Sequence, residues 1–139
     1  MSREIKFRIW DAHKNEFVNQ PLSRRLAISC GGGIYTGLYD CVITEQFIAQ
    51  QYTGLKDSIG KEIYEGDILA YEGGDWDRGQ DGTDDRMEII WDNKNCKFGI
   101  NFWSKHGGEG YTGREHHLID FLGGAKIIGN ISENPELLA

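Results

Sequence analysis

The first residues of the chain alternate between apolar and polar side chains. In "REIKFRIWD", residues 3–11, one set of positions holds Ile5, Phe7 and Ile9, and the other holds Lys6, Arg8 and Trp10. A period of two is typical of a β-strand with one buried face. We therefore expect a strand here, with Ile5, Phe7 and Ile9 turned toward a core.

Two stretches far apart in the chain share the pattern of a strand, a turn and a returning strand. "IWDAHKNEF" at 9–17 and "IWDNKNCKF" at 90–98 have Ile, Trp, Asp and Phe at equal spacing. Asp and Asn favour turns because their side chains bond nearby backbone groups. Both stretches therefore predict hairpins. Convergent turn chemistry is the simpler explanation of the similarity, and an ancestral repeat is the alternative.

The region between these hairpins predicts further strands. "RLAISC" at 25–30 and "YDCVITEQFIAQQY" at 39–52 are apolar and β-branched runs, separated by the glycines at 31–33. Such runs bounded by Gly favour strands. The second run also fits a short helix, so its structure stays open at this point.

The stretch "QYTGLKDSIGKEIYEGDIL" at 51–69, called the corner segment below, is dense in turn signals. "KDSIGK" predicts a tight turn with a positive φ at Gly60, closing a hairpin between "YTGL" and "KEIY". "EGD" at 65–67 predicts a second turn or bulge at Gly66, which leads into "ILAY". We interpret the segment as a structural motif whose apolar residues are buried. Its members are Tyr52, Gly54, Leu55, Asp57, Gly60, Ile63, Tyr64, Gly66, Asp67 and Ile68.

The second half of the chain predicts a long loop, two strands, a helical turn and a closing strand. Residues 71–86 are polar, acidic and rich in Gly, which is typical of an exposed or partly disordered loop. "MEIIW" and "KFGINFW" predict strands, "EHHLIDFL" a short helix, and "AKIIGNI" the last strand. In the tail "NPELLA", Asn134, Pro135 and Glu136 suit a helix start, as cap, first position and first-turn acid.

Short strands with tight hairpins favour a small, strongly bent barrel over an open sheet. We expect a mainly β protein built on an SH3-like barrel. The barrel would carry the acidic loop 71–86, a short helical turn and a C-terminal helical tail.

Composition and charge narrow the function classes. The 139 residues carry a formal charge of −7, and their basic residues are scattered. Nucleic-acid binding proteins usually show a basic stripe, so nucleic acid is not the expected main partner. Cys30, Cys41 and Cys96 are odd in number and widely spaced, which suits free thiols in a reducing compartment. With no membrane-length apolar run and no signal-peptide core, we expect a soluble intracellular protein.

Three motifs, in order, give the chain a resemblance to a known family. "REIKFRIWD", the corner segment and "IIGNISENPELL" at 127–138 together resemble the YopX family of bacteriophage and prophage proteins. The resemblance runs from end to end, although the acidic loop and "REHHLID" have no counterpart in the family pattern. It implies a two-part β-rich structure, with a small N-terminal β part at 1–55 followed by the SH3-like barrel at 56–139. It also implies self-association and a place in the cytoplasm of a bacterial host. It implies no catalytic residues, because the family has no established biochemical activity.

The sequence offers only weak candidates for a metal-binding or catalytic site. Adjacent His116 and His117 point to different sides of a helix or strand, so they cannot share one metal in regular geometry, although His116 and Asp120 could if the helix forms. The acidic loop lacks the spacing of an EF-hand, and no nucleophile elbow or phosphate-binding loop is present. We expect no catalytic residue, no cofactor and no tightly bound metal. Possible interaction residues are Trp76, His116 and His117.

Three function classes remain, and the first is preferred. It is a phage accessory protein that catalyses nothing and acts by associating with itself and with an unidentified host or phage protein. The second is a nucleic-acid module, because small barrels often bind DNA or RNA. The third is a metal-dependent hydrolase built on "EHHLID" and the acidic loop. We expect Trp10, Trp91 and Trp103 to be core or interface rings.

Overall fold

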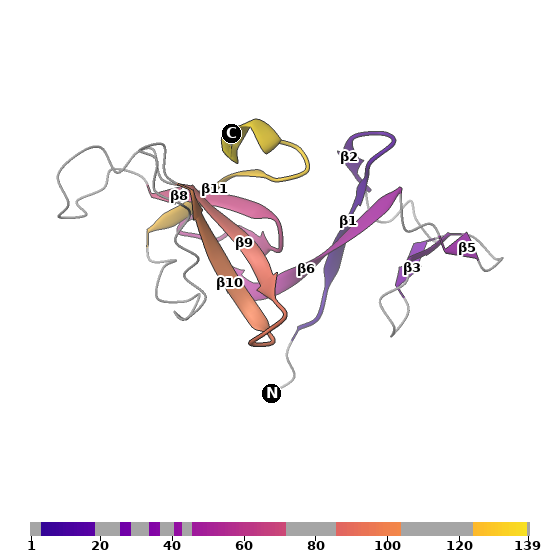
Figure 1. Ribbon diagram of the computed structural model, residues 1–139, viewed down its shortest axis with the longest axis horizontal. Coiled ribbons are helices and arrows are strands. Elements are labelled where there is room, and N and C mark those ends of the chain that lie inside the picture. Colours follow the sequence, from indigo (N-terminus) through magenta and orange to yellow (C-terminus); the bar gives the residue numbers. More distant parts are fainter. Residues whose placement is uncertain are drawn as a thin grey trace. The chain divides into compact units, whose positions relative to one another are not determined.

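The computed structural model describes residues 4–18, 26–28, 34–36, 41–42, 46–71, 86–103 and 124–138. In these ranges the chain is mainly β, with almost no helix (Figure 1). The elements are β1 (Phe7–Asp11), β2 (Glu16–Phe17), β3 (Leu26–Ile28), β4 (Ile34–Thr36), β5 (Cys41–Val42), β6 (Phe47–Lys56), β7 (Glu62–Tyr64), β8 (Asp67–Tyr71), β9 (Arg86–Asp92), β10 (Lys97–Trp103), β11 (Ala125–Asn130) and the 3-10 helix η1 (Pro135–Leu138). None of the described residues belongs to a helix long and apolar enough to cross a lipid bilayer.

The chain divides into two compact units. Unit 1 comprises Met1–Ile5 and Tyr52–Ala139, and unit 2 comprises Lys6–Gln51. The boundary after Gln51 lies inside β6, whose first half pairs with β1 and whose second half pairs with β7. One continuous strand therefore contributes to the sheets of both units.

Unit 2 contains the first predicted hairpin and a small meander. β1 lies between β2 and β6, antiparallel to both. The short strands β3, β4 and β5 form a separate antiparallel sheet in that order. The residues of "YDCVITEQFIAQQY" that the structure describes contain strands β5 and β6, and the alternative of a short helix does not hold for them.

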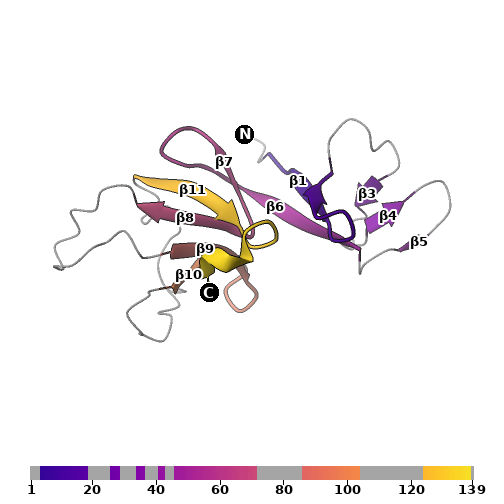
Figure 2. The same ribbon diagram turned by 90° about the horizontal axis from the view of Figure 1, so that it is seen from above.

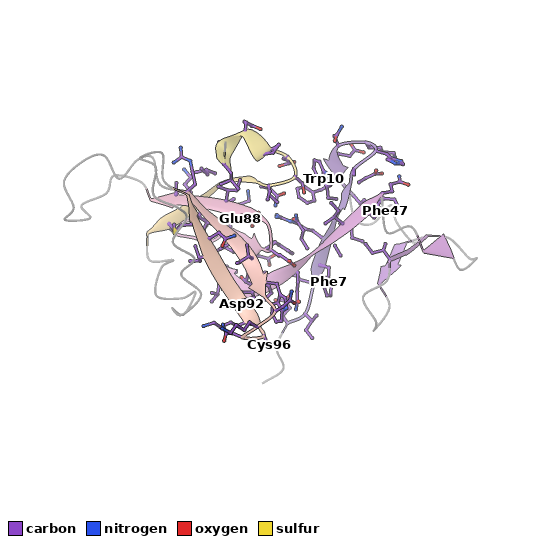
Figure 3. The ribbon with its side chains drawn as sticks, viewed as in Figure 1. Phe7, Trp10, Phe47, Glu88, Asp92 and Cys96 are labelled. Carbon is purple, nitrogen blue, oxygen red and sulfur yellow. The ribbon has the colours of Figure 1, made fainter. Side chains whose placement is uncertain are left out.

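Burial along β1 corrects the predicted buried face. Ile5 and Phe7 are 65% and 38% exposed, whereas Ile9 and Trp10 are only 6% and 4% exposed. The reason is that β2 reaches only the second half of β1, where Trp10 lies opposite both Phe17 and Ile48. The ring of Trp10 packs edge-on against Phe17 with centroids 5.0 Å apart. Burial thus rises toward the turn instead of alternating, and Figure 3 shows Phe7 and Trp10 near opposite ends of the strand.

Unit 1 is built on an antiparallel sheet with the order β10-β9-β8-β11. This sheet curls like half of a barrel, and Figure 2 shows β11 beside β8 within it. Alternate residues of its strands point to one side and form the core, as a period of two requires. The buried core residues are Ile63, Leu69, Met87, Ile89, Ile100 and Ala125, and Leu55, Phe98 and Ile127 pack against them.

The second predicted hairpin is β9 and β10, paired from Arg86↔Trp103 to Asp92↔Lys97. Trp91 continues the core-facing row of Met87 and Ile89, yet it is 38% exposed. Of the two places expected for Trp91, core or interface, this exposure excludes a fully buried core position. The ladder between β8 and β9 extends only to Ile68↔Glu88 and ends before Trp91. Tyr71 and Arg86, expected at the edges of a loop, are strand residues. Residues 72–85 and the predicted helix at 115–122 lie outside the described residues.

The C-terminal residues fold back on β11 at Gly129. A Cβ atom at this position would lie 2.6 Å from Cδ1 of Leu137 and 2.7 Å from Oδ1 of Asn134, so only glycine fits without a shift. That amide oxygen also accepts a hydrogen bond of 3.3 Å from the backbone N–H of Asn130. The last strand and the 3-10 helix are thus in close contact, which explains a glycine in the middle of a strand.

Replacing Gly129 with alanine should lower the free energy of unfolding by about 1–3 kcal/mol, because the added methyl group would overpack the contact with Leu137 and Asn134. Chemical denaturation of the variant measures the loss. The matched control is Gly99→Ala in β10, where a Cβ atom would meet Ile90 at an ordinary 3.8 Å. Equal stability of the two variants would contradict close packing of the C-terminal residues on β11.

Candidate functional site

Asp57 is the residue through which the corner segment reaches the far end of the chain. Its carboxylate is buried, and Oδ1 accepts hydrogen bonds from the backbone N–H groups of Ile59 at 3.1 Å and Lys61 at 2.8 Å. Oδ2 accepts a third from the backbone N–H of Ile127 in β11, at 3.1 Å. The neighbouring N–H of Ser58 donates to the carbonyl of Ala125 at 2.9 Å. The turn between β6 and β7 is thereby fixed to the outer edge of β11.

The same contacts set the charge state of Asp57. Burial alone would raise the pKa of its carboxyl. The three backbone N–H groups and the nearby ammonium of Lys61 more than offset this effect, so the pKa lies below its ordinary value. Hydrogen bonds to the charged form favour the carboxylate. Asp57 is thus an acceptor held in its ionised form, and both of its oxygens are occupied.

Asp67 forms a second connection, between the corner segment and the C-terminal motif. It is 1% exposed, and Oδ2 accepts a hydrogen bond from the backbone N–H of Tyr64 at 2.8 Å. Its Oδ1 accepts from the side-chain amide of Asn130 at 3.3 Å. The amide oxygen of Asn130 in turn accepts from the backbone N–H of Ser132 at 2.9 Å. These bonds satisfy polar groups whose burial would otherwise be costly.

Three glycines of the corner segment have the left-handed backbone that favours glycine. The values of φ are 88° at Gly54, 86° at Gly60 and 83° at Gly66. Gly66 is also held from both sides, because its N–H donates to Ile89 and its carbonyl accepts from Ile131, each at 2.8 Å. At Gly54 the register between β6 and β7 shifts. The hydroxyl of Thr53 spans this bulge by donating to the carbonyl of Ile63 and accepting from the N–H of Leu55.

The apolar residues of the segment lie where a structural motif needs them. Tyr52, Ile63 and Ile68 are buried, and Leu55 and Tyr64 are half-buried. The rings of Tyr52 and Tyr64 lie on facing strands with centroids 5.4 Å apart. Ile63 belongs to the core cluster, and Leu55 packs against it. The segment therefore contributes both to the core and to the turns that close the sheet.

Most of the residues expected to form an interaction site or a metal site lie outside the part of the chain that the structure describes. Trp76, His116 and His117 lie outside the described residues, and so do residues 72–85 of the acidic loop. Within the ranges that the structure describes, no group of three or more His, Cys, Asp or Glu side chains lies close enough to hold a metal ion. The described thiol, that of Cys96, is exposed. The described geometry is thus that of a structural junction and two hairpins.

The long-range hydrogen bonds of this junction were not predicted from the sequence. Asp57 starts a turn through Ile59 and Lys61, as its position predicts, but its bond to Ile127 has no counterpart among the predictions. Asn130 has no predicted role at all. The available signal was an Asn two residues before Ser132 in an apolar strand, since Asn commonly bonds a backbone N–H two residues later.

Comparison with known proteins agrees with the resemblance indicated by the motifs. A family model described as YopX protein matches residues 6–139, which include the corner segment and the C-terminal motif. The comparison with curated proteins gave no match. Among solved structures, the chain is similar to the crystal structure of protein EF1440 from Enterococcus faecalis. The two share 28% identity, with 99% of this chain and 100% of that chain covered and a TM-score of 0.56.

Replacing Asp57 with asparagine should destabilise the protein by about 1–3 kcal/mol at pH 7, because an amide cannot accept all three backbone hydrogen bonds. The pKa of Asp57 is lowered in the folded state, so its contribution is full above about pH 4 and is lost as the pH falls through the lower, folded value. Urea unfolding from pH 7 to pH 3 should show the difference between parent and variant shrinking in acid. The exposed Glu133→Gln variant is the control and should match the parent at pH 7. A difference that is constant with pH would contradict the role of the carboxylate.

Substitutions in the corner segment separate a structural motif from a recognition site. Gly66→Val should cost on the order of 1–3 kcal/mol through backbone strain, and Ile68→Ala about 2–5 kcal/mol through lost burial. Lys56→Ala, at the exposed end of β6, and Lys61→Ala, at an exposed position of the turn, should melt close to the parent. Thermal unfolding measures all four. If the glycine and isoleucine variants were as stable as the parent while the lysine variants lost partner binding, the segment would be a recognition site.

Proposed function

Because the chain belongs to the YopX protein family, we propose that it is a phage or prophage accessory protein that acts by associating with itself and with another protein and catalyses no reaction. The observation that carries this proposal is the contrast between the interior and the surface. The polar residues of the motifs bond to the chain itself, whereas large apolar side chains are exposed. These are Ile5, Phe7, Ile48, Ile59, Trp91, Ile128 and Ile131.

The interior part of this contrast argues against catalysis in the described residues. Asp57 and Asp67 are the buried acids of the corner segment, and both accept hydrogen bonds from backbone N–H groups. A general acid or base needs a proton position that a substrate can reach. Neither the name of the family nor that of the similar Enterococcus protein refers to a reaction. Surfaces are therefore the better candidates for function.

The surface part supports association. Exposed large apolar side chains are normal when scattered, but they favour protein contacts when they lie on open strand edges and sheet faces. Phe7 and Ile48 in unit 2 are 38% and 47% exposed, although both lie in paired strands. The formal charge of −7 opposes nucleic acid as the main partner. The proposed partners are a second copy of the chain and a host or phage protein in the bacterial cytoplasm.

The proposal has a structural side. We assign residues 56–139 to an SH3-like barrel with a helical tail, preceded by a β-rich part at 1–55. Support comes from the curled sheet and from the turn after β6, which Asp57 and Ser58 fix to the edge of β11. Such closure removes an open strand edge, which is the usual advantage of a barrel over an open sheet.

Light scattering on the untagged protein at micromolar concentration should give a mass above that of one chain, because exposed apolar surface is removed from water on association. Raising the salt concentration should preserve the assembly, since apolar contacts are not screened. A chain that stays monomeric across this concentration range would refute self-association.

A further inference from the structure

The two hairpins that share the sequence pattern also share their geometry. In the first turn, Oδ1 of Asp11 accepts from the backbone N–H groups two and three residues later, at 3.0 and 3.2 Å. In the second, Oδ1 of Asp92 does the same at 3.0 and 3.4 Å. Each turn ends in a residue with positive φ, 53° at Asn15 and 50° at Cys96. Figure 3 shows Asp92 and Cys96 at the turn end of the second hairpin.

The aromatic pair behind each turn is also equivalent. Trp10 and Phe17 pack with centroids 5.0 Å apart and an interplanar angle of 73°, and Trp91 and Phe98 with 5.1 Å and 77°. The two tryptophans differ in exposure, at 4% for Trp10 and 38% for Trp91. Parts of the protein outside the hairpin therefore cover more of the Trp10 ring than of the Trp91 ring.

A third strand lies beside the first hairpin. β6 runs antiparallel to β1, with Ile48 opposite Trp10, and the carbonyl of Gln46 accepts from the backbone N–H of Ala12 at 2.8 Å. Among the described residues, no strand pairs with the equivalent edge beside Trp91. β8 pairs with β9 at Ile68↔Glu88 and Leu69↔Met87.

The backbone of this edge faces outward. In an antiparallel strand, alternate residues direct their N–H and C=O groups to the same side. The carbonyl of Ile89 accepts from Gly66, so Ile89 faces away from β10, and Trp91 in the same strand faces the same way. Asn93 begins the turn, at the position that Ala12 holds in the first hairpin. The positive φ of Gly66 turns the preceding chain toward β7, which pairs with β6. The N–H and C=O of Trp91 and the N–H of Asn93 correspond to the groups of Trp10 and Ala12 that β6 engages.

We propose that the edge of β9 from Trp91 to Asn93 is a docking site for one extended segment of a partner protein, added antiparallel as a further strand. This inference rests on the proposed function, because it names a surface through which the chain associates with another protein. The first hairpin indicates what the partner segment should resemble, since β6 already pairs with the equivalent edge there. Strand addition draws its affinity from backbone hydrogen bonds and its selectivity from alternate side chains.

The differences between the hairpins narrow the chemistry of the occupant. Asp11 needs the side-chain amide of Gln46, which donates to its two oxygens at 3.2 and 3.4 Å. Asp92 receives an equivalent bond from its own loop, where Nδ2 of Asn95 donates to Oδ2 at 2.8 Å. The partner strand therefore needs no amide at this position. It needs an aliphatic side chain opposite Trp91, as Ile48 is opposite Trp10. It also needs a residue other than proline at each paired position, because proline has no backbone N–H to donate.

The test uses a synthetic peptide with the sequence of residues 45–51, EQFIAQQ, which is the strand that fits the first hairpin. Titrated into the isotope-labelled full chain, it should produce saturable NMR shifts at the amides of Trp91 and Asn93 and at the Trp91 indole. The resonances of Trp10 should not move, because β6 already occupies that edge. A peptide with proline in place of the isoleucine, which lacks that N–H, should bind at least tenfold more weakly.

Variants of the chain complete the test. Trp91→Ala should weaken the peptide at least tenfold, and Trp91→Phe should retain most of the affinity. The exposed position of Trp91 makes both compatible with folding, which the dispersion of the remaining amide signals checks. Absence of saturable shifts up to millimolar peptide, shifts at Trp10 alone, or undiminished binding to Trp91→Ala would each overturn the proposal.

Light scattering on the same variants separates this inference from the proposed function. If Trp91→Ala converts an oligomer into single chains, the edge is a contact between copies and its assignment to another protein is wrong, while self-association stands. If the parent is monomeric and binds the peptide through Trp91, self-association is wrong and the docking site stands.

Discussion

The carboxylate of Asp57 is the constraint on which the described part of unit 1 depends. It accepts backbone hydrogen bonds from its own turn and from Ile127, which lies 70 residues later in the chain. A neutral amide of the same size could not accept all three hydrogen bonds and would leave at least one backbone N–H without its acceptor. The bonds also fix where the turn after β6 meets β11.

Two of the three motifs, the corner segment and the C-terminal motif, meet at the same junction. Gly66 is bonded to Ile89 and Ile131, Asp67 to Asn130, and Gly129 leaves room for the C-terminal residues. Residues far apart in sequence therefore depend on one another for burial and for hydrogen bonds. Such dependence explains a shared signature without a catalytic or binding role for each residue in it. It also directs attention from the signature residues to the exposed apolar side chains.

Local features of the fold could be predicted from the sequence, and long-range features could not. The hairpins could be predicted from their turn residues. The positive φ of Gly60 could be predicted from a glycine shortly after Asp57 and Ser58, and the turn at Gly66 from a glycine between Glu65 and Asp67. The buried face of β1 was predicted wrongly, because a period of two cannot tell how far a neighbouring strand extends. The bond from Asp57 to Ile127 was also beyond reach, since one sequence carries no signal that pairs residues across a long gap.

The twin hairpins show where the local information ends. Their turns agree in hydrogen bonds, backbone angles and ring geometry because these depend on side chains within nine residues of sequence. Their tryptophans differ in exposure and in strand pairing, since β6 lies beside Trp10, and the hairpin sequence does not encode this third strand. Among the described residues, the same local motif is thus flanked by a third strand in unit 2 and has an unpaired edge beside Trp91 in unit 1. An open edge with a large apolar ring carries a cost in exposed surface, and that cost is removed when another strand covers the ring.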